Sequence, residues 1–253
     1  MTDPGPSRSR TLVVDGLANA RDLGGLRLRH GGLTPRGVFC RSASADLITA
    51  AGWEQVRAAG IRTVVDLRQP GERAAGNGRR PGWLNTVAVD LDGLENTEFW
   101  RGYISNGLIG TALYFLPHLA AMPERAGAAL SAIMTAPPGG VLFHCMGGRD
   151  WTGMIAMLLL AAAGAEPADI VGDYMESVRN GAALAAGAGR QDNEPALEAI
   201  CRAHGSTTEG AFRLAVEGLN LAALLDAAAT GADVRAALAT WRGRLPPAPI
   251  RLR

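Results

Sequence analysis

Residues 141–153 read VLFHCMGGRDWTG, and this stretch decides both the expected fold and the expected chemistry. The apolar run Val141 to Phe143 follows the breaker Pro137-Pro138-Gly139-Gly140 and is typical of a buried strand. A cysteine and two glycines come next, and an apolar helix is expected from Thr152 to Ala163. This order of strand, glycine-containing turn and helix predicts a loop whose backbone N–H groups converge at a helix N-terminus.

Such a loop favours the binding of an anion and the activation of a thiol. Glycines let the backbone close around the anion, and the helix dipole adds positive potential. The same field promotes loss of the thiol proton, so Cys145 is expected to be a low-pKa nucleophile, unlike Cys40 and Cys201. We expect His144 to hold the loop and lower this pKa further, and Thr152 to hydrogen-bond the sulfur. An isolated cysteine is more often a small buried apolar residue, but the HC-x-x-G-x-D-x-T-G spacing favours an anion site.

Short β-rich runs alternate with helical patterns along the rest of the chain. This alternation predicts an α/β fold with a central, mostly parallel sheet flanked by helices. Ile61 to Leu67 reads as a fully buried strand, so it is expected to be central. Further strands are expected at 38–40, 86–89 and 141–143, and helices at 49–59, 98–118, 123–136, 167–178 and, with breaks at Gly205 and Gly231, 194–244.

The length of 253 residues fits one large domain. Residues 1–10 are polar and Pro-rich and are expected to form a disordered tail. Residues 11–244 are expected to form a single domain, in which the Ala-rich part 181–244 is a helical lid or extension. Residues 245–253 read as a Pro-rich tail.

The composition excludes several classes of function. A net charge of +1, from 25 basic residues that are all arginine, offers no basic field for nucleic acid. Three distant cysteines and four scattered histidines predict neither a disulfide framework nor a metal site, and no cofactor is expected. The longest apolar run, Met154 to Ala165, is shorter than the roughly 20 residues of a membrane helix. We therefore expect a cytoplasmic protein without stable membrane insertion.

Four segments outside the loop also carry recognisable motifs. Together with the loop they resemble the bacterial tyrosine phosphatases that carry an HCxxGKDRTG loop, which are related to dual-specificity and phosphoinositide phosphatases. The resemblance runs from about Asn19 to Asn180 and implies the fold of the Cys-loop phosphatases. The matching segments are 19–25 (NARDLGG), Arg41-Ser42 with 47–49 (LIT), 61–72 (IRTVVDLRQPGE), and Asp173-Tyr174 with Ser177 and Asn180.

The resemblance implies a role for most residues of the loop. Cys145 is the implied nucleophile, which forms a cysteinyl-phosphate that water then hydrolyses. Asp150 matches the loop aspartate, Thr152 is the implied stabiliser of the thiolate, and Arg149 replaces a lysine that reaches the substrate from the loop rim. The implied phosphate-binding positions are Met146, Gly147, Gly148, Arg149, Trp151 and Gly153, with His144 and Arg68 as supporting residues.

A general acid must protonate the leaving alcohol. Asp66, at the carboxyl end of a central strand, is the preferred candidate, and Asp150 is the next. Asp90 and Asp92 stay open as further candidates. The alternative for Asp66 is a structural carboxylate that pairs with Arg68 or caps the following turn.

Trp151 stands where the resembled family has the arginine that binds two phosphate oxygens. Because the loop offers the indole no evident partner, we expect Trp151→Arg to raise activity. The function predicted first is that of a protein-tyrosine-phosphatase-like phosphoric monoester hydrolase. Its substrate would be a phosphorylated protein, lipid or small molecule. The alternatives are a pseudophosphatase that binds an anionic ligand, and a biosynthetic enzyme that reuses the same fold.

Overall fold

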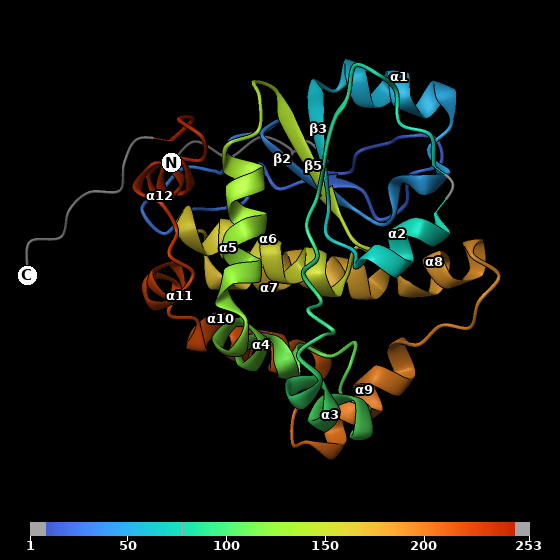
Figure 1. Ribbon diagram of the computed structural model, residues 1–253, viewed down its shortest axis with the longest axis vertical. Coiled ribbons are helices and arrows are strands. Elements are labelled where there is room, and N and C mark those ends of the chain that lie inside the picture. The colour runs from blue at the N-terminus through green and yellow to red at the C-terminus, as the bar shows by residue number, and fades with distance from the viewer. Residues whose placement is uncertain (1–8, 77, 246–253) are drawn as a thin grey trace, which may run out of the picture.

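The computed structural model describes residues 9–76 and 78–245, and its centre is a five-stranded sheet (Figure 1). In spatial order the strands run β1-β2-β5-β3-β4. β1 is antiparallel to β2, and the other neighbouring pairs are parallel. The expected mostly parallel sheet is therefore confirmed. The strands are β1 (Arg21–Asp22), β2 (Phe39–Ser42), β3 (Ile61–Asp66), β4 (Asn85–Ala88) and β5 (Gly140–His144).

Helices cover both faces of the sheet. Alternate residues of a strand point to opposite faces, so a strand that is apolar throughout needs packing partners on both sides. Val64 of β3 packs in one cluster with Trp53 and Val56 of α1 (Ala50–Ala58). Its neighbour Val65 and Phe143 of β5 belong to the larger cluster on the other face, which includes α5, α6 and α7. Both faces of β3 and β5 are thus buried, as the unbroken apolar runs of these strands predict.

The helices largely follow the predicted ranges. The expected helix over 98–118 is interrupted, because Gly107 and Gly110 adopt positive φ angles of 65° and 89°. The apolar helix after the loop begins at Asp150, two residues earlier than expected. The remaining helices are α2 (Pro70–Ala75), α3 (Thr97–Ser105), α4 (Phe115–Ala121), α5 (Pro123–Met134), α6 (Asp150–Ala162) and α7 (Pro167–Arg179), with 3-10 turns at Ala45–Leu47 and Ala112–Tyr114.

The C-terminal part is helical, as expected. It comprises α8 (Gly181–Gly187), α9 (Glu194–Ala203), α10 (Thr208–Gly218), α11 (Leu221–Ala227) and α12 (Ala232–Ala239). α10 packs on α7, and α11 and α12 pack on α5 (Figure 1). The breaks at Gly205 and Gly231 are present, and a further one follows Gly218. Within the described residues, none of the helices combines the length and the apolar character needed to span a membrane.

The two predicted tails fall almost entirely on residues 1–8 and 246–253, which lie outside the described residues. Arg10 is described, and its guanidinium donates to Asp173 at 2.8 Å. The folded structure therefore includes Arg10, which the sequence places in the N-terminal tail.

Candidate active site

Neighbouring segments of the chain hold the loop between β5 and α6 by donating hydrogen bonds to its carbonyl groups. The carbonyl of Met146 accepts a hydrogen bond from the N–H of Ser44 at 2.9 Å. That of Gly148 accepts from Arg41 Nη2 at 2.8 Å, and Asn19 donates to the carbonyl of Gly147 at 3.1 Å. Within the described part of the chain, the N–H groups of residues 146–149 donate to no carbonyl. Apart from the N–H of Gly148, which is directed at the Cys145 sulfur, these donors are therefore available to an anion.

Glycine is required at two positions near this loop for different reasons. Gly148 has φ +68°, and a Cβ atom there would overlap the backbone of Ser42. Gly153 lies inside α6, where a Cβ atom would come within 2.9 Å of the Tyr174 ring. Gly153 thus permits α6 and α7 to approach closely. This packing role replaces the phosphate contact expected for Gly153.

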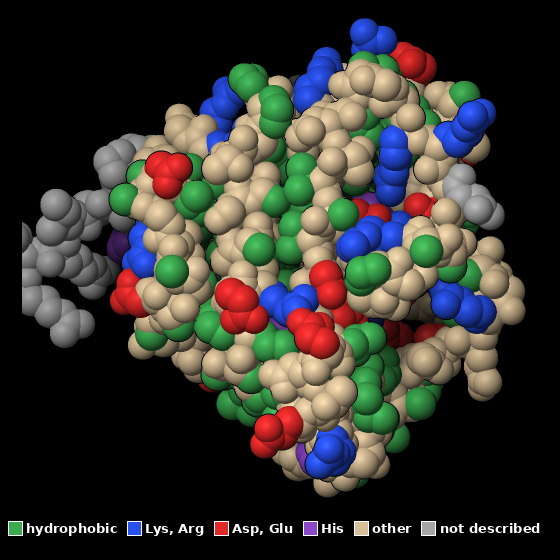
Figure 2. Space-filling model, viewed as in Figure 1, with side chains coloured by type: hydrophobic (Ala, Val, Ile, Leu, Met, Phe, Trp, Pro, Cys, Tyr) green, Lys and Arg blue, Asp and Glu red, His purple; other side chains and the backbone are tan. Residues whose placement is uncertain are grey.

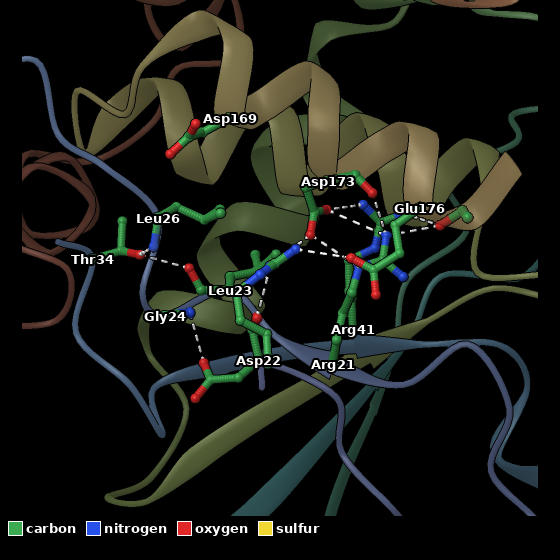
Figure 3. A network of polar contacts seen from close by, with 12 residues as sticks. Arg21, Asp22, Leu23, Gly24, Leu26, Thr34, Arg41, Asp169, Asp173 and Glu176 are labelled. Carbon is green, nitrogen blue, oxygen red and sulfur yellow. Dashed lines mark hydrogen bonds and ion pairs between the residues drawn. The ribbon is translucent and has the colours of Figure 1, made fainter. Parts of the chain in front are cut away.

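A buried polar network beneath the loop joins three segments that are distant in sequence (Figure 3). Asp173 on α7 receives Arg21 Nε at 2.9 Å and Arg41 Nη1 at 2.6 Å. Ser177, one turn later, accepts from Arg21 Nη2 at 2.8 Å. Burial alone would raise the pKa of Asp173, but the two arginines hold it well below its ordinary value. The sequence places these residues in matching segments without a role, and the structure shows that they fix the carbonyl side of the loop.

Asp173→Asn is expected to lower the free energy of unfolding by about 3–5 kcal/mol, because it leaves two buried arginines uncompensated. The contribution of Asp173 is present above its unfolded pKa of about 3.9, and it is lost as the pH falls further, since its folded pKa is the lower one. Urea unfolding at pH 7 and at pH 2 measures both effects. Asp169→Asn, one turn earlier on α7, is the matched control, because its partner Arg27 is 66% exposed. A loss at Asp173 no larger than that at Asp169 would contradict the assignment.

Cys145 lies at the base of the loop with 5% of its surface exposed. The hydroxyl of Thr152 donates to its sulfur at 3.2 Å, the contact expected from the sequence. Burial nevertheless raises the pKa of the Cys145 thiol, although Thr152 and the N–H of Gly148 act in the opposite direction. This direction is opposite to the lowered pKa expected from the sequence. Cys40 and Cys201 also have raised pKa values, again mainly through burial, so the expected contrast among the three thiols is absent.

His144 is fully buried at the end of β5. Its Nδ1 lies 3.1 Å from the carbonyl of Cys145, and its Nε2 lies 3.3 Å from Arg80 and 3.8 Å from Asp66. Burial lowers the pKa of His144 to about 4. The imidazole is therefore neutral at pH 7. It supports the end of the strand, but it does not supply the positive charge that was expected to activate Cys145.

Asp66 is the preferred general acid of the sequence, and its position contradicts that role. Arg68 binds it in a fork, with Nε at 2.9 Å from Oδ1 and Nη2 at 2.8 Å from Oδ2. Burial would raise the pKa of Asp66, but the bonds to Arg68 bring it below the ordinary value. The side chain also does not line the cavity at Cys145. The alternative interpretation, a structural pair with Arg68, is the correct one.

The cavity in front of Cys145 has a volume of about 220 Å³. Three carboxylates line it, from Glu72 on α2, Asp92 after β4 and Asp150 at the start of α6. Burial, followed by the neighbouring Glu72, raises the pKa of Asp92 to about 7. A carboxylic acid with that pKa can give up a proton near neutral pH. Asp92 therefore replaces Asp66 as the candidate acid. Within the described residues, no cluster of histidine, cysteine and acidic side chains could hold a metal ion.

A model of the tyrosine phosphatase family matches residues 12–222, which include the loop, the network beneath it and all five strands. The chain belongs to the tyrosine phosphatase family. The chain is 35% identical over 171 residues, 66% of its length, to a candidate tyrosine-protein phosphatase of Cupriavidus necator. It is 30% identical over 144 residues to a tyrosine-protein phosphatase of Nostoc commune, and 30% identical over 172 residues to the triple specificity protein phosphatase PtpB of Mycobacterium tuberculosis.

These similarities span 62%, 48% and 62% of the three relatives, respectively, so each match leaves more than a third of the relative's length uncovered. They cover 66%, 55% and 57% of the present chain. The crystal structure of P. aeruginosa TpbA in complex with pTyr is similar at 16% identity and a TM-score of 0.37, over 77% of this chain and 87% of that chain.

Arg149 lines the cavity at Cys145, but its guanidinium is already held by other groups of the chain. Its Nε lies 2.6 Å from Glu194 Oε1, and its Nη2 donates to Glu194 Oε2 at 2.9 Å. Its Nη1 donates to Asp150 at 2.7 Å and to the carbonyl of Gly110. The one cation of this loop is thus paired with two carboxylates. The sequence could not show this, because Glu194 lies 45 residues further along the chain.

Trp151 occupies the arginine position of the phosphatase loop, and it has partners that the sequence did not reveal. Its ring packs edge-on against Trp100 at 6.0 Å and Tyr114 at 5.5 Å between centroids, and lies 4.8 Å from His118. Its indole also lies near Asp92 and acts to lower the pKa of that carboxyl group, against the larger effect of burial. The premise that the indole has no partner is therefore wrong. Trp151 forms one wall of the cavity at Cys145.

Proposed function

We propose that this chain is a cysteine-dependent phosphatase that hydrolyses phosphomonoesters through a cysteinyl-phosphate on Cys145. The observation that carries the proposal is the position of the Cys145 sulfur. It lies at the N-terminus of α6 and lines a cavity, at the base of a loop whose N–H groups donate to no carbonyl among the described residues. Membership in the tyrosine phosphatase family supports the same reaction.

In the proposed reaction, the Cys145 thiol first gives its proton to a phosphoryl oxygen of the substrate dianion. The thiolate then attacks phosphorus, and the bond to the leaving oxygen breaks. The loop N–H groups bind the phosphoryl oxygens. Protonated Asp92 gives its proton to the leaving oxygen, and the resulting carboxylate then accepts a proton from the water that hydrolyses the cysteinyl-phosphate. The Thr152 hydroxyl, 3.2 Å from the sulfur, stabilises the thiolate that leaves in this second step.

The proposed partner is a phosphorylated substrate, as the names of the relatives suggest. The cavity of about 220 Å³ is smaller than the roughly 300–1,000 Å³ of typical sites for drug-sized ligands, which favours a small phosphomonoester or a single side chain. A cytoplasmic location and the absence of nucleic-acid binding stay predictions from the sequence.

Incubation with p-nitrophenyl phosphate, followed by acid quenching and mass spectrometry, tests this function. We expect steady release of p-nitrophenol and a phosphorylated peptide that contains Cys145. Release without phosphorylation of Cys145 would contradict the proposed intermediate. Failure to release p-nitrophenol, together with binding of phosphate or vanadate, would support the second candidate, a binding protein without turnover. Trp151 at the arginine position and the paired Arg149 favour that second candidate.

Turnover is expected to fall above pH 7, by about tenfold for each pH unit, because Asp92 must be protonated to act as the acid and its pKa is about 7. Asp92→Asn should remove this alkaline limb and slow an alkyl phosphate more than p-nitrophenyl phosphate, whose leaving group needs little protonation. Asp66→Asn is the comparison, and its losses should be equal on the two substrates. An alkaline limb that persists in Asp92→Asn would exclude Asp92 as the acid.

A further inference from the structure

The cavity at Cys145 has a charge that does not suit a phosphate group alone. Of its three carboxylates, Asp150 is paired with Arg149. Among the described residues, neither Glu72 nor Asp92 takes part in an ion pair, and the buried Oδ2 of Asp92 accepts no hydrogen bond. Glu72 and Asp92 also repel each other's ionised forms, which helps to raise the pKa of Asp92. Ionising two unpaired carboxyl groups next to an anion site costs free energy unless a cation also binds there.

Nearby arginines do not neutralise this pair, because other acids bind them. Arg149 is paired with Glu194, and Arg68 is paired with Asp66 and Asp46. Arg125 on α5 pairs with Asp90 and Glu95. The free negative charge of the cavity is therefore available to a ligand.

The other walls of the cavity are aromatic or apolar. Trp100, Tyr114 and Trp151 line its interior. At its rim lie Leu94, Ile109 and Met146, three large apolar side chains that are 46%, 45% and 39% exposed. Figure 2 shows a hollow below α2 with acidic side chains visible inside it, and with apolar, basic and uncharged surface at its rim. Exposed apolar side chains that gather at one cavity indicate a ligand or partner that covers them.

Acidic groups among aromatic and apolar walls select a particular kind of cation. A primary ammonium carries three N–H donors, and the aromatic and apolar walls of this cavity would leave those that face away from Glu72 without an acceptor. A methylated ammonium is weakly hydrated and binds well to aromatic rings with a carboxylate nearby. The phosphoryl group of the same molecule would bind to the loop N–H groups at Cys145. One ligand would then occupy both the anion site and the acidic, aromatic part of the cavity.

We propose that the substrate is a small phosphomonoester whose leaving group carries a methylated ammonium, bound between Glu72 and the aromatic wall formed by Trp100, Tyr114 and Trp151. This substrate class rests on the proposed phosphatase function, in which Asp92 stays protonated as the acid. The cation would compensate the charge of Glu72 when the cavity is filled.

The test compares phosphocholine with 3,3-dimethylbutyl phosphate, which has the same shape but carries carbon in place of the charged nitrogen. Calorimetric titration of the full chain with Cys145→Ser gives both dissociation constants without turnover. We expect phosphocholine to bind at least about tenfold more tightly. Glu72→Gln should reduce this ratio to about threefold or less. Glu54→Gln, on α1 with a 68% exposed side chain, is the matched control and should keep the ratio.

Equal affinities for the two compounds would overturn the inference, and so would phosphoethanolamine binding as tightly as phosphocholine. Hydrolysis of p-nitrophenyl phosphate by the unmodified chain is measured separately. Turnover of that ester combined with equal affinities would leave the phosphatase function standing and remove the ammonium site. A tenfold ratio without turnover of any phosphate ester would support the ammonium site and remove the phosphatase function.

Discussion

Replacing Cys145 by serine is expected to lower the turnover of an aryl phosphate by about 10³-fold or more, as removal of other catalytic nucleophiles does. A serine hydroxyl needs a base to lose its proton, and the described residues around position 145 supply none. The imidazole of His144 points away, with Nε2 towards Arg80 and Asp66. The Thr152 hydroxyl donates to position 145 and does not remove a proton from it.

Initial rates with p-nitrophenyl phosphate, for the unmodified chain and for Cys145→Ser, measure this effect. Cys40→Ser and Cys201→Ser are the controls, since both thiols are buried and neither lines the cavity. Their rates should stay within a few-fold of the unmodified chain under conditions where they are folded. An unchanged rate in Cys145→Ser would show that water is activated directly, and the loop would then serve only to bind phosphate.

The sheet and the loop could be predicted from the sequence because their signals are local. An unbroken apolar run predicts a strand that is buried on both faces, and β3 and β5 have that environment. The side chain of Thr49 caps α1 by accepting from the N–H of Gly52 at 3.0 Å, as its position before the helix indicates. The loop spacing likewise places Thr152 on the sulfur of Cys145.

The side-chain partners could not be predicted, because they come from distant segments. Asp66 ends a strand in the way an acid of an α/β site often does, but the fork of Arg68 occupies both of its oxygens. Arg149 is held by Glu194 of the C-terminal helices, a region outside the segments that match the resembled family. The aromatic neighbours of Trp151 come from α3 and the segment before α4. Each of these pairings depends on the packing of helices around the sheet, which local patterns do not encode.

Trp151→Arg is expected to raise activity, and the structure indicates that it also lowers the stability of the fold. The indole packs against Trp100 and Tyr114 and is only 9% exposed, so its removal should lower the free energy of unfolding by about 1–3 kcal/mol. An arginine would however meet Glu72 and Asp92, whose carboxylates can compensate its charge. We therefore expect Trp151→Arg to fold.

The expected gain in activity of Trp151→Arg can be measured in two ways. A guanidinium beside Cys145 should lower the pKa of the thiol, which burial now raises, and so accelerate alkylation by iodoacetamide at mildly acidic pH. Phosphate or vanadate should slow that alkylation. The charged fork should also raise kcat/KM for p-nitrophenyl phosphate by roughly 10²-fold, since it binds two oxygens of the transition state.

Trp151→Phe is the matched control, because it keeps an aromatic wall and adds no charge, and it should show neither effect. The proposed ammonium site predicts a further property of Trp151→Arg. Trp151→Arg places a cation where the methylated ammonium binds, so its preference for phosphocholine over the neutral ester should disappear while its activity on aryl phosphate rises. A fall in aryl phosphate activity without any change in thiol reactivity would instead assign the indole a direct role, as a surface on which an aromatic substrate stacks.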